Sequence, residues 1–265
     1  MKRIIALVLT VAMMLTGVFA LSSCGAGSDK EAVKGAGKLV VGVTVYPPMD
    51  YVDSDTGEWT GFDADLAKMF AETLGVNCQI VIINWNNKVA EINSKQIDLI
   101  WNGMTASDEL GEKIDFSVSY AKNAQVAVVK KGSSITKDGV KDAKIAVEGG
   151  SAGAIVAEKD IKASEANINK VTAQVDALNE VKAGTSDVAI VDITMAQNIV
   201  GKDQYSDLTI LEGASYGDEI FAVGLRKGSD LKADLDAFLK DKYADGTLTK
   251  LAEKYNVGLN VDALK

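Results

Sequence analysis

The chain contains no histidine and only two cysteines among its 265 residues. The absence of histidine excludes a catalytic triad with imidazole, a zinc site with imidazole ligands and proton transfer by imidazole near neutral pH. The formal net charge of −9 argues against a nucleic-acid partner, because phosphate binding requires a basic face. We therefore expect no nucleic-acid partner, and no sequence pattern indicates a metal or another cofactor.

The first residues are typical of a targeting signal. Met1-Lys2-Arg3 is a short basic region, and the apolar run 4–20 that follows is short for a membrane span. Leu21-Ser22-Ser23-Cys24 resembles a bacterial lipobox, so residues 1–23 are expected to be a lipoprotein signal peptide and Cys24 the lipidated residue. A plain signal peptide and a membrane anchor are the alternatives. Residues 24–37 are small and polar, which predicts a flexible tether.

Apolar segments of strand length alternate with helical patterns in the first half of the chain. The run 38–45 is typical of a parallel strand that is buried on both faces. Leu66, Phe70 and Leu74 recur every four residues, which places them on one face of a helix that ends at Gly75. With further strands expected at 78–83 and 97–101, the order is β-α-β-α-β, which indicates an α/β fold.

A weak internal repeat points to two lobes. In 92–101 and again in 181–190, the end of a helix leads through a polar turn to an acid and a buried strand. The shared register puts Gly103 and Asp192 at equivalent strand ends, one in each lobe. Strand ends that face each other across two lobes form a cleft, where ligands commonly bind.

Two other patterns suggest sites that the spacing does not support. The acids of 50–59 suggest a calcium loop, but the glycine comes one residue too early and the bidentate glutamate is missing, so a hairpin turn is expected. The glycine-rich turn 149–153 opens a helix and could hold an anion, but it lacks the lysine and the spacing of a phosphate loop.

The segment 96–120 carries several motifs in a fixed order. They are Ile97-Asp98, Gly103-Met104-Thr105, Asp115-Phe116-Ser117 and Tyr120. This order resembles the extracellular amino-acid-binding proteins of ABC importers, the polar-amino-acid group called family 3, and the resemblance extends from Lys38 to about Tyr255.

That resemblance implies a two-lobed fold like that of type II periplasmic binding proteins. Each lobe should hold a mixed, mainly parallel sheet flanked by helices, and two hinge crossovers should join the lobes. The expected boundaries are 38–122 together with 221–265 for lobe 1, and 123–220 for lobe 2.

The resemblance also implies a ligand site between the lobes. Tyr46 and Trp85 match positions where aromatic rings cover the ligand, although Tyr46 could instead fill the edge of lobe 1. Asp192 matches the aspartate that binds an α-ammonium, and the alternative is a helix N-cap. The remaining expected contacts are Asn102, Gly103, Met104, Thr105, Leu110 and Ser151.

Leu110 departs from the family pattern. The resemblance implies an arginine here, which would grip the ligand's α-carboxylate, and the only arginine after the signal is Arg226. Backbone N–H groups near Thr105 and Ser151 could hold the carboxylate, or the ligand could lack one. A lysine could also substitute as a point charge, and the candidates are Lys88 and Lys122, each of which could equally be a solvated surface lysine.

The function implied is a binding protein and not an enzyme. A small amine-bearing ligand, expected to be an amino acid, would be captured by hinge closure and passed to ABC permease and ATPase subunits. The protein would be a monomer, held at the extracytoplasmic face of the bacterial cell membrane by the lipid on Cys24. The alternatives are an enzyme of the same fold, such as a dehydratase, and a sensor domain.

Overall fold

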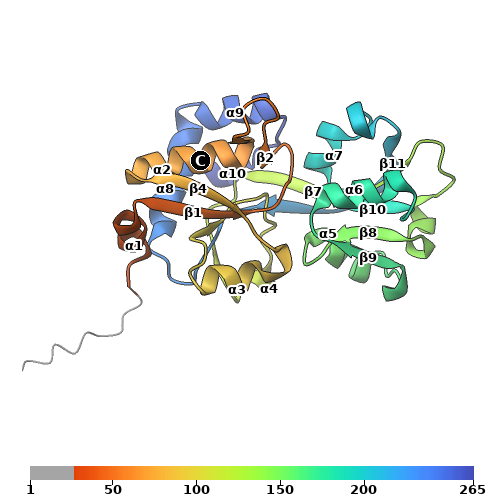
Figure 1. Cartoon of the computed structure of the whole chain (residues 1–265), viewed down its shortest axis with the longest axis horizontal. Helices are drawn as coiled ribbons and strands as arrows, with labels where there is room; N and C mark the ends of the chain where they lie inside the picture. The colour runs from red at the N-terminus through yellow and green to blue at the C-terminus, as the bar shows by residue number, and fades with distance from the viewer. Residues whose placement is uncertain (1–26) are drawn as a thin grey trace, which may run out of the picture.

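The computed structural model of the protein describes residues 27–265, so the predicted signal peptide and the predicted lipidation site Cys24 lie outside the described part. Two five-stranded sheets lie side by side, each flanked by helices, and form two lobes (Figure 1). The strand orders are β4-β1-β5-β12-β6 in lobe 1 and β11-β7-β10-β8-β9 in lobe 2. This arrangement confirms the predicted two-lobed α/β fold.

Lobe 1 is built on parallel pairing of β1 with both β4 and β5, and β12 pairs antiparallel with β5 and β6. Its strands are β1 (Lys38–Val43), β4 (Asn77–Ile82), β5 (Leu99–Ile100), β6 (Asp115–Phe116) and β12 (Gly224–Leu225), with the hairpin β2 (Tyr51–Val52) and β3 (Trp59–Thr60). Its helices are α1 (Asp29–Ala36), α2 (Phe62–Leu74), α3 (Lys88–Asn93), α4 (Asp108–Gly111), α8 (Leu231–Ala244), α9 (Thr247–Tyr255) and α10 (Val261–Leu264). The hairpin confirms the turn that was predicted in place of a calcium loop.

Lobe 2 combines parallel pairing of β8 with β9 and β10 and antiparallel pairing of β7 with β10 and β11. Its strands are β7 (Ala121–Lys130), β8 (Ile145–Glu148), β9 (Ile168–Val171), β10 (Val188–Asp192) and β11 (Leu208–Phe221). Its helices are α5 (Ala152–Ile155), α6 (Gln174–Ala183) and α7 (Ile193–Ile199). One end of the β7–β11 pair reaches lobe 1, where Phe221 bridges to Thr105 and Ala121 bridges to Leu259.

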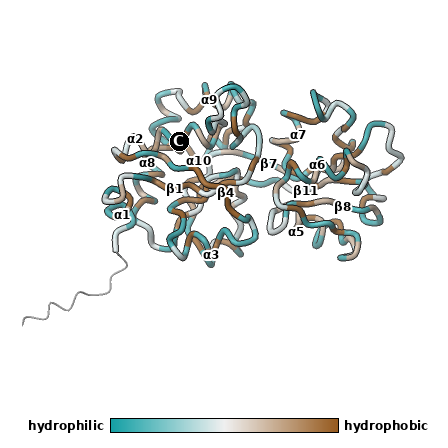
Figure 2. Tube along the Cα trace, in the orientation of Figure 1, coloured by the Kyte–Doolittle hydropathy of each residue, from teal (hydrophilic) through white to brown (hydrophobic). Residues whose placement is uncertain are grey.

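The predicted helical face of α2 is buried. Leu66 and Phe70 are 0% exposed, and Gly75 ends the helix in the left-handed conformation with a φ of 74°. Figure 2 shows hydrophobic segments along β1 and β8, each of which is second from one edge of its sheet. Burial of these faces supplies the main favourable term in the folding of each lobe. Within residues 27–265, no helix has both the length and the apolar character needed to cross a membrane.

The internal repeat has the same structural role in both lobes. Asp98 accepts a hydrogen bond from the N–H of Val40 at 2.9 Å, and Asp187 accepts one from the N–H of Lys144 at 3.0 Å. Each acid stands before a buried strand and ties it to the start of the neighbouring parallel strand. The matched register of Gly103 and Asp192 follows from this shared geometry.

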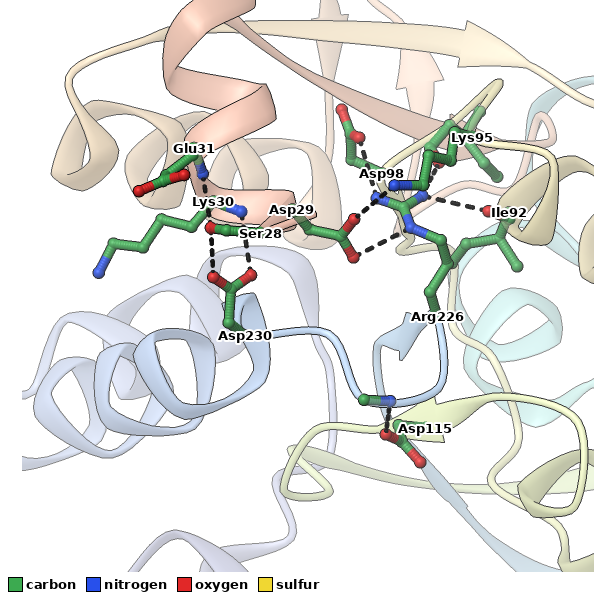
Figure 3. Close-up of polar contacts among 12 residues, drawn as sticks. Ser28, Asp29, Lys30, Glu31, Ile92, Lys95, Asp98, Asp115, Arg226 and Asp230 are labelled. Atoms are coloured by element: carbon green, nitrogen blue, oxygen red, sulfur yellow. Dashed lines mark hydrogen bonds and ion pairs between the residues drawn. The ribbon is translucent and has the colours of Figure 1, made fainter. Parts of the chain in front are cut away.

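The prediction of a flexible tether over 24–37 is wrong for Asp29–Ala36, which form helix α1. Ser28 caps the helix by accepting a hydrogen bond from the N–H of Glu31 at 2.9 Å, and Val33 is 2% exposed against lobe 1. Asp29 also pairs with Arg226 (Figure 3). Small polar composition suggested a linker, but the cap, one buried apolar residue and an ion pair fix this segment on the fold.

Candidate functional site

A pocket between the lobes brings together residues that are far apart in the sequence. Seven of the nine predicted contacts line it: Trp85, Asn102, Gly103, Met104, Thr105, Leu110 and Asp192. Lys88, one of the two lysines considered as a substitute for the missing arginine, lines it too, and so do Glu148 and Gln174, which were not predicted. The carboxyl ends of parallel strands from both lobes point to this pocket, which is the usual place for a ligand in α/β sheets.

Asp192 ends β10 and is 3% exposed. Its Oδ1 accepts hydrogen bonds from Asn123 Nδ2 and Gln125 Nε2, and its Oδ2 accepts one from Gln174 Nε2, each at 2.5 Å. It occupies the N-cap position of α7, but its side chain makes no capping hydrogen bond. Burial and the charge of Glu219 raise the pKa of Asp192 to about 6. The carboxylate is thus held by neutral amides, and no cationic side chain of residues 27–265 is bonded to it.

Glu219, on β11, shares these amides. Its Oε2 accepts from Asn123 Nδ2 at 2.9 Å and from Gln125 Nε2 at 3.0 Å. The hydroxyl of Thr105 also donates to this oxygen at 3.0 Å, so it binds the hinge strand β11 from lobe 1. Two amides of β7 therefore join Asp192 to Glu219 where the lobes meet. No motif in the sequence marked Glu219.

Lys88 is the lysine that the structure brings into the pocket, whereas Lys122 is exposed on β7 and does not line it. The Lys88 ammonium donates to the carbonyl of Trp85 at 3.2 Å and, across the lobes, to the carbonyl of Gly150 at 2.8 Å. It lies 4.8 Å from the centroid of the Trp85 ring. Burial lowers the pKa of Lys88 to about 8. Two of its three donors are therefore occupied by carbonyls.

Glu148 ends β8, directly before the Gly149-Gly150 turn, and is 2% exposed. Its Oε1 is buried and has no hydrogen-bond partner among residues 27–265. Burial, reinforced by the charge of Asp192, raises the pKa of Glu148 to about 8. The signal that singled out Asp192, an acid at the end of an apolar strand, is also present here and could have identified Glu148.

Tyr46 lies beneath the pocket and does not line it. Its side chain is 1% exposed, and its ring packs edge-on against Phe221 with centroids 6.5 Å apart. A Cβ at Gly103 would lie 2.5 Å from Tyr46 Cε1, and Gly103 has a φ of +52°, so glycine is required where the backbone crosses the ring. The N–H of Gly103 donates a hydrogen bond to Asp63 at 2.6 Å, so this donor is already used within the protein.

The Asn102 amide is also engaged within lobe 1. Its Oδ1 accepts from the N–H of Thr44 at 3.0 Å, and its Nδ2 donates to Asp50 at 2.7 Å. These bonds hold the ends of β1 and β5 together. Asn102 therefore shapes the pocket wall, with its hydrogen-bonding groups turned to the protein.

The other predicted contacts form walls and edges of the pocket. Met104 is 1% exposed, and Leu110 on α4 presents an apolar side chain where an arginine was expected. Ser151 lines an adjoining cavity that shares Lys88 and Leu110 with the pocket, and its Oγ accepts from the N–H of Ala154 at 3.2 Å to cap α5. Among the residues described, no three histidine, cysteine, aspartate or glutamate side chains form a metal site. The pocket thus offers carboxylates, apolar walls and one lysine, a set suited to a cationic ligand.

Comparison with known proteins gives a consistent result. The model of the bacterial extracellular solute-binding proteins, family 3, matches residues 39–258. The arginine-binding extracellular protein ArtP of Bacillus subtilis is 30% identical and aligns with 95% of this chain and 98% of its own length. The L-cystine-binding protein TcyJ of Escherichia coli is 32% identical, with 84% of each chain covered.

A solved structure agrees with the sequence relatives. An ABC uptake transporter substrate-binding protein from Streptococcus pneumoniae, solved with bound histidine, has a TM-score of 0.79 and 29% identity, and covers 87% of this chain and 96% of its own. These relatives are named as binding proteins and not as enzymes. The match over most of the chain, with the two-lobed fold and the pocket between the lobes, places the protein in the bacterial extracellular solute-binding proteins of family 3.

Proposed function

We propose that the protein captures an amino acid or a related amine-bearing small molecule between its lobes and delivers it to an ABC importer. The observation that carries the proposal is Asp192, a buried carboxylate in the inter-lobe pocket to which no cationic side chain of the described residues is bonded. A buried charge is costly unless it is paired, and a ligand ammonium would supply the missing cation.

Capture proceeds by hinge closure in this proposal. The moving units are 38–122 with 221–265, and 123–220, and β7 and β11 connect them. The contact of Lys88 with the carbonyl of Gly150 supports closure, because it joins the lobes directly over the pocket. The ligand would then be covered by Trp85 and Leu110 from lobe 1 and held by Asp192 from lobe 2.

The same proposal includes the partners and the location. A permease and an ATPase subunit would receive the ligand from the closed protein, which acts as a monomer. A lipid on Cys24 would anchor the chain at the extracytoplasmic face of the bacterial cell membrane. The support for the anchor is the sequence Leu21-Ser22-Ser23-Cys24 after an apolar run.

A thermal-shift panel tests the capture of amines. The purified protein is heated with each of the common amino acids and with their amides and decarboxylated amines, and each mixture is then examined by mass spectrometry. We expect a raised Tm with amine-bearing compounds, recovered unchanged. The shift should vanish in Asp192→Asn and persist in Asp207→Asn, which removes an exposed acid of lobe 2. A changed product would indicate an enzyme, and an unaltered shift in Asp192→Asn would contradict the site.

A further inference from the structure

We propose that Glu148 binds a second cationic group of the ligand, so that the pocket selects compounds with two positive charges, each an ammonium or a guanidinium. This inference rests on the proposed capture of an amine and adds a substrate class to it. Asp192 holds one charge, and Glu148 holds the other.

The geometry of Glu148 carries the inference. The side chain is 2% exposed and lines the same pocket as Asp192, yet its Oε1 has no hydrogen-bond partner in the described part of the chain. Buried polar groups are normally satisfied, and an unsatisfied one in a pocket calls for a partner that comes from outside the chain. A donor with a positive charge suits a carboxylate best, because charge-assisted hydrogen bonds are about twice as strong as neutral ones.

Lys88, which also lines the pocket, does not supply the missing hydrogen-bond partner of Glu148. The Lys88 ammonium is hydrogen-bonded to the carbonyls of Trp85 and Gly150, and no ion pair joins it to Glu148. A cationic group of the ligand would favour the ionised form of Glu148, and the single positive charge of Lys88 then stands against the carboxylates of Glu148 and Asp192, with Glu219 beside them. A ligand with one ammonium and one carboxylate leaves that excess of negative charge in place, whereas a ligand with two cationic groups reduces it.

The positions of the two acids set the kind of ligand. Glu148 ends β8 and Asp192 ends β10, and these strands are parallel neighbours in lobe 2. Both side chains line the same pocket, so two cationic groups joined by a short alkyl chain can reach both carboxylates. Trp85 and Leu110 supply apolar surface for such a chain from lobe 1.

Four compounds separate the contributions of the two ligand charges. Calorimetric titrations use two pairs of compounds, lysine with norleucine and 1,5-diaminopentane with pentylamine. In each pair, the second compound lacks the distal ammonium of the first. We expect the second compound to bind at least tenfold more weakly than the first. In Glu148→Gln this difference should fall below threefold, whereas Glu212→Gln, which removes an exposed acid of β11, should retain it.

One further variant and the wild type decide the inference. Glu148→Asp keeps the charge on a shorter side chain and should retain part of the preference. Equal binding of lysine and norleucine by the wild type would overturn the second site and leave the capture of amines standing. A preference that persists in Glu148→Gln, or no binding of any of the four compounds, would also overturn it. The broader panel with Asp192→Asn judges the capture of amines separately.

Discussion

The guanidinium of Arg226 donates from Nε to the Asp29 carboxylate at 3.0 Å and so joins helix α1 to the turn that precedes α8 (Figure 3). Its Nη1 donates to the carbonyls of Ile92 and Ile97 at 3.1 and 2.7 Å. Nη2 pairs with Asp98 at 3.3 Å. The only arginine after Arg3 in the sequence therefore stabilises lobe 1, and its donors are turned away from the pocket.

Replacement of this arginine should be strongly destabilising. Arg226→Met leaves the Asp29 carboxylate buried and two carbonyls without donors, so we expect a loss of about 3–5 kcal/mol in the free energy of unfolding. Urea denaturation measures it. Lys227→Met is the matched control, because Lys227 is exposed and its pair with Asp115 should contribute about 1 kcal/mol or less. Equal losses in the two variants would contradict a structural role for Arg226.

Glu148 gives the ligand-free protein an unusual pH dependence. Its pKa is raised from 4.5 to about 8, so the folded state binds a proton more tightly than the unfolded state. This contribution to stability is fully present below pH 4.5 and is lost as the pH rises toward 8, at a slope of at most about 1.4 kcal/mol per pH unit. Asp192, with a pKa raised to about 6, contributes in the same direction at the lower end of the range.

Urea denaturation from pH 5 to pH 8 checks this expectation. Stability should fall with pH in the wild type and fall less in Glu148→Gln, which carries no proton to lose. The Lys88 ammonium, with a pKa lowered to about 8, acts in the opposite direction only above that pH, so it does not mask the trend. A wild-type stability that rises from pH 5 to pH 8 would show that Glu148 is ionised at little cost.

Lys88 should favour the closed arrangement of the lobes. Lys88→Met removes the hydrogen bond to the carbonyl of Gly150, so the ligand-free variant should have a larger radius of gyration than the wild type in small-angle scattering. Lys122→Met changes an exposed lysine of β7 and should leave the scattering profile unchanged. Identical profiles for the wild type and Lys88→Met would show that this contact does not control closure.

Cys24 should determine where the protein is found. If the lipobox is processed, Cys24→Ala removes the thiol that carries the lipid, and the protein should pass from the membrane fraction to the medium of the producing bacterium. Immunoblots of the two fractions measure this shift. A variant that stays in the membrane fraction without loss of residues 1–23 would contradict lipoprotein processing.

The order of motifs predicted the fold well because each motif has a local cause. Asp98 and Asp187 each precede a buried strand and bind the neighbouring strand. The spacing of residues after these two acids was therefore enough to match equivalent positions in the two lobes. Asp192 was likewise visible as an acid at the end of an apolar strand.

Contacts between distant segments were harder to predict from the sequence. Glu219 lies on β11, whose pairing with β7 is interrupted by two register shifts, and its partners Asn123 and Gln125 come from another strand. The docking of α1 depends on Arg226, which lies 197 positions from Asp29. Tyr46 could be matched to a family position, but only the packing against Phe221 and Gly103 places it beneath the pocket.

The capture of an amine at Asp192 is the central claim, and one titration tests it most directly. The amine with the largest thermal shift is titrated calorimetrically into the wild type, Asp192→Asn and Asp207→Asn, after matching circular dichroism spectra show that all three are folded. We predict that Asp192→Asn loses about 2–5 kcal/mol of binding free energy, the range for removing one partner of a buried charge pair, while Asp207→Asn binds like the wild type. Equal affinity of all three proteins would contradict the claim.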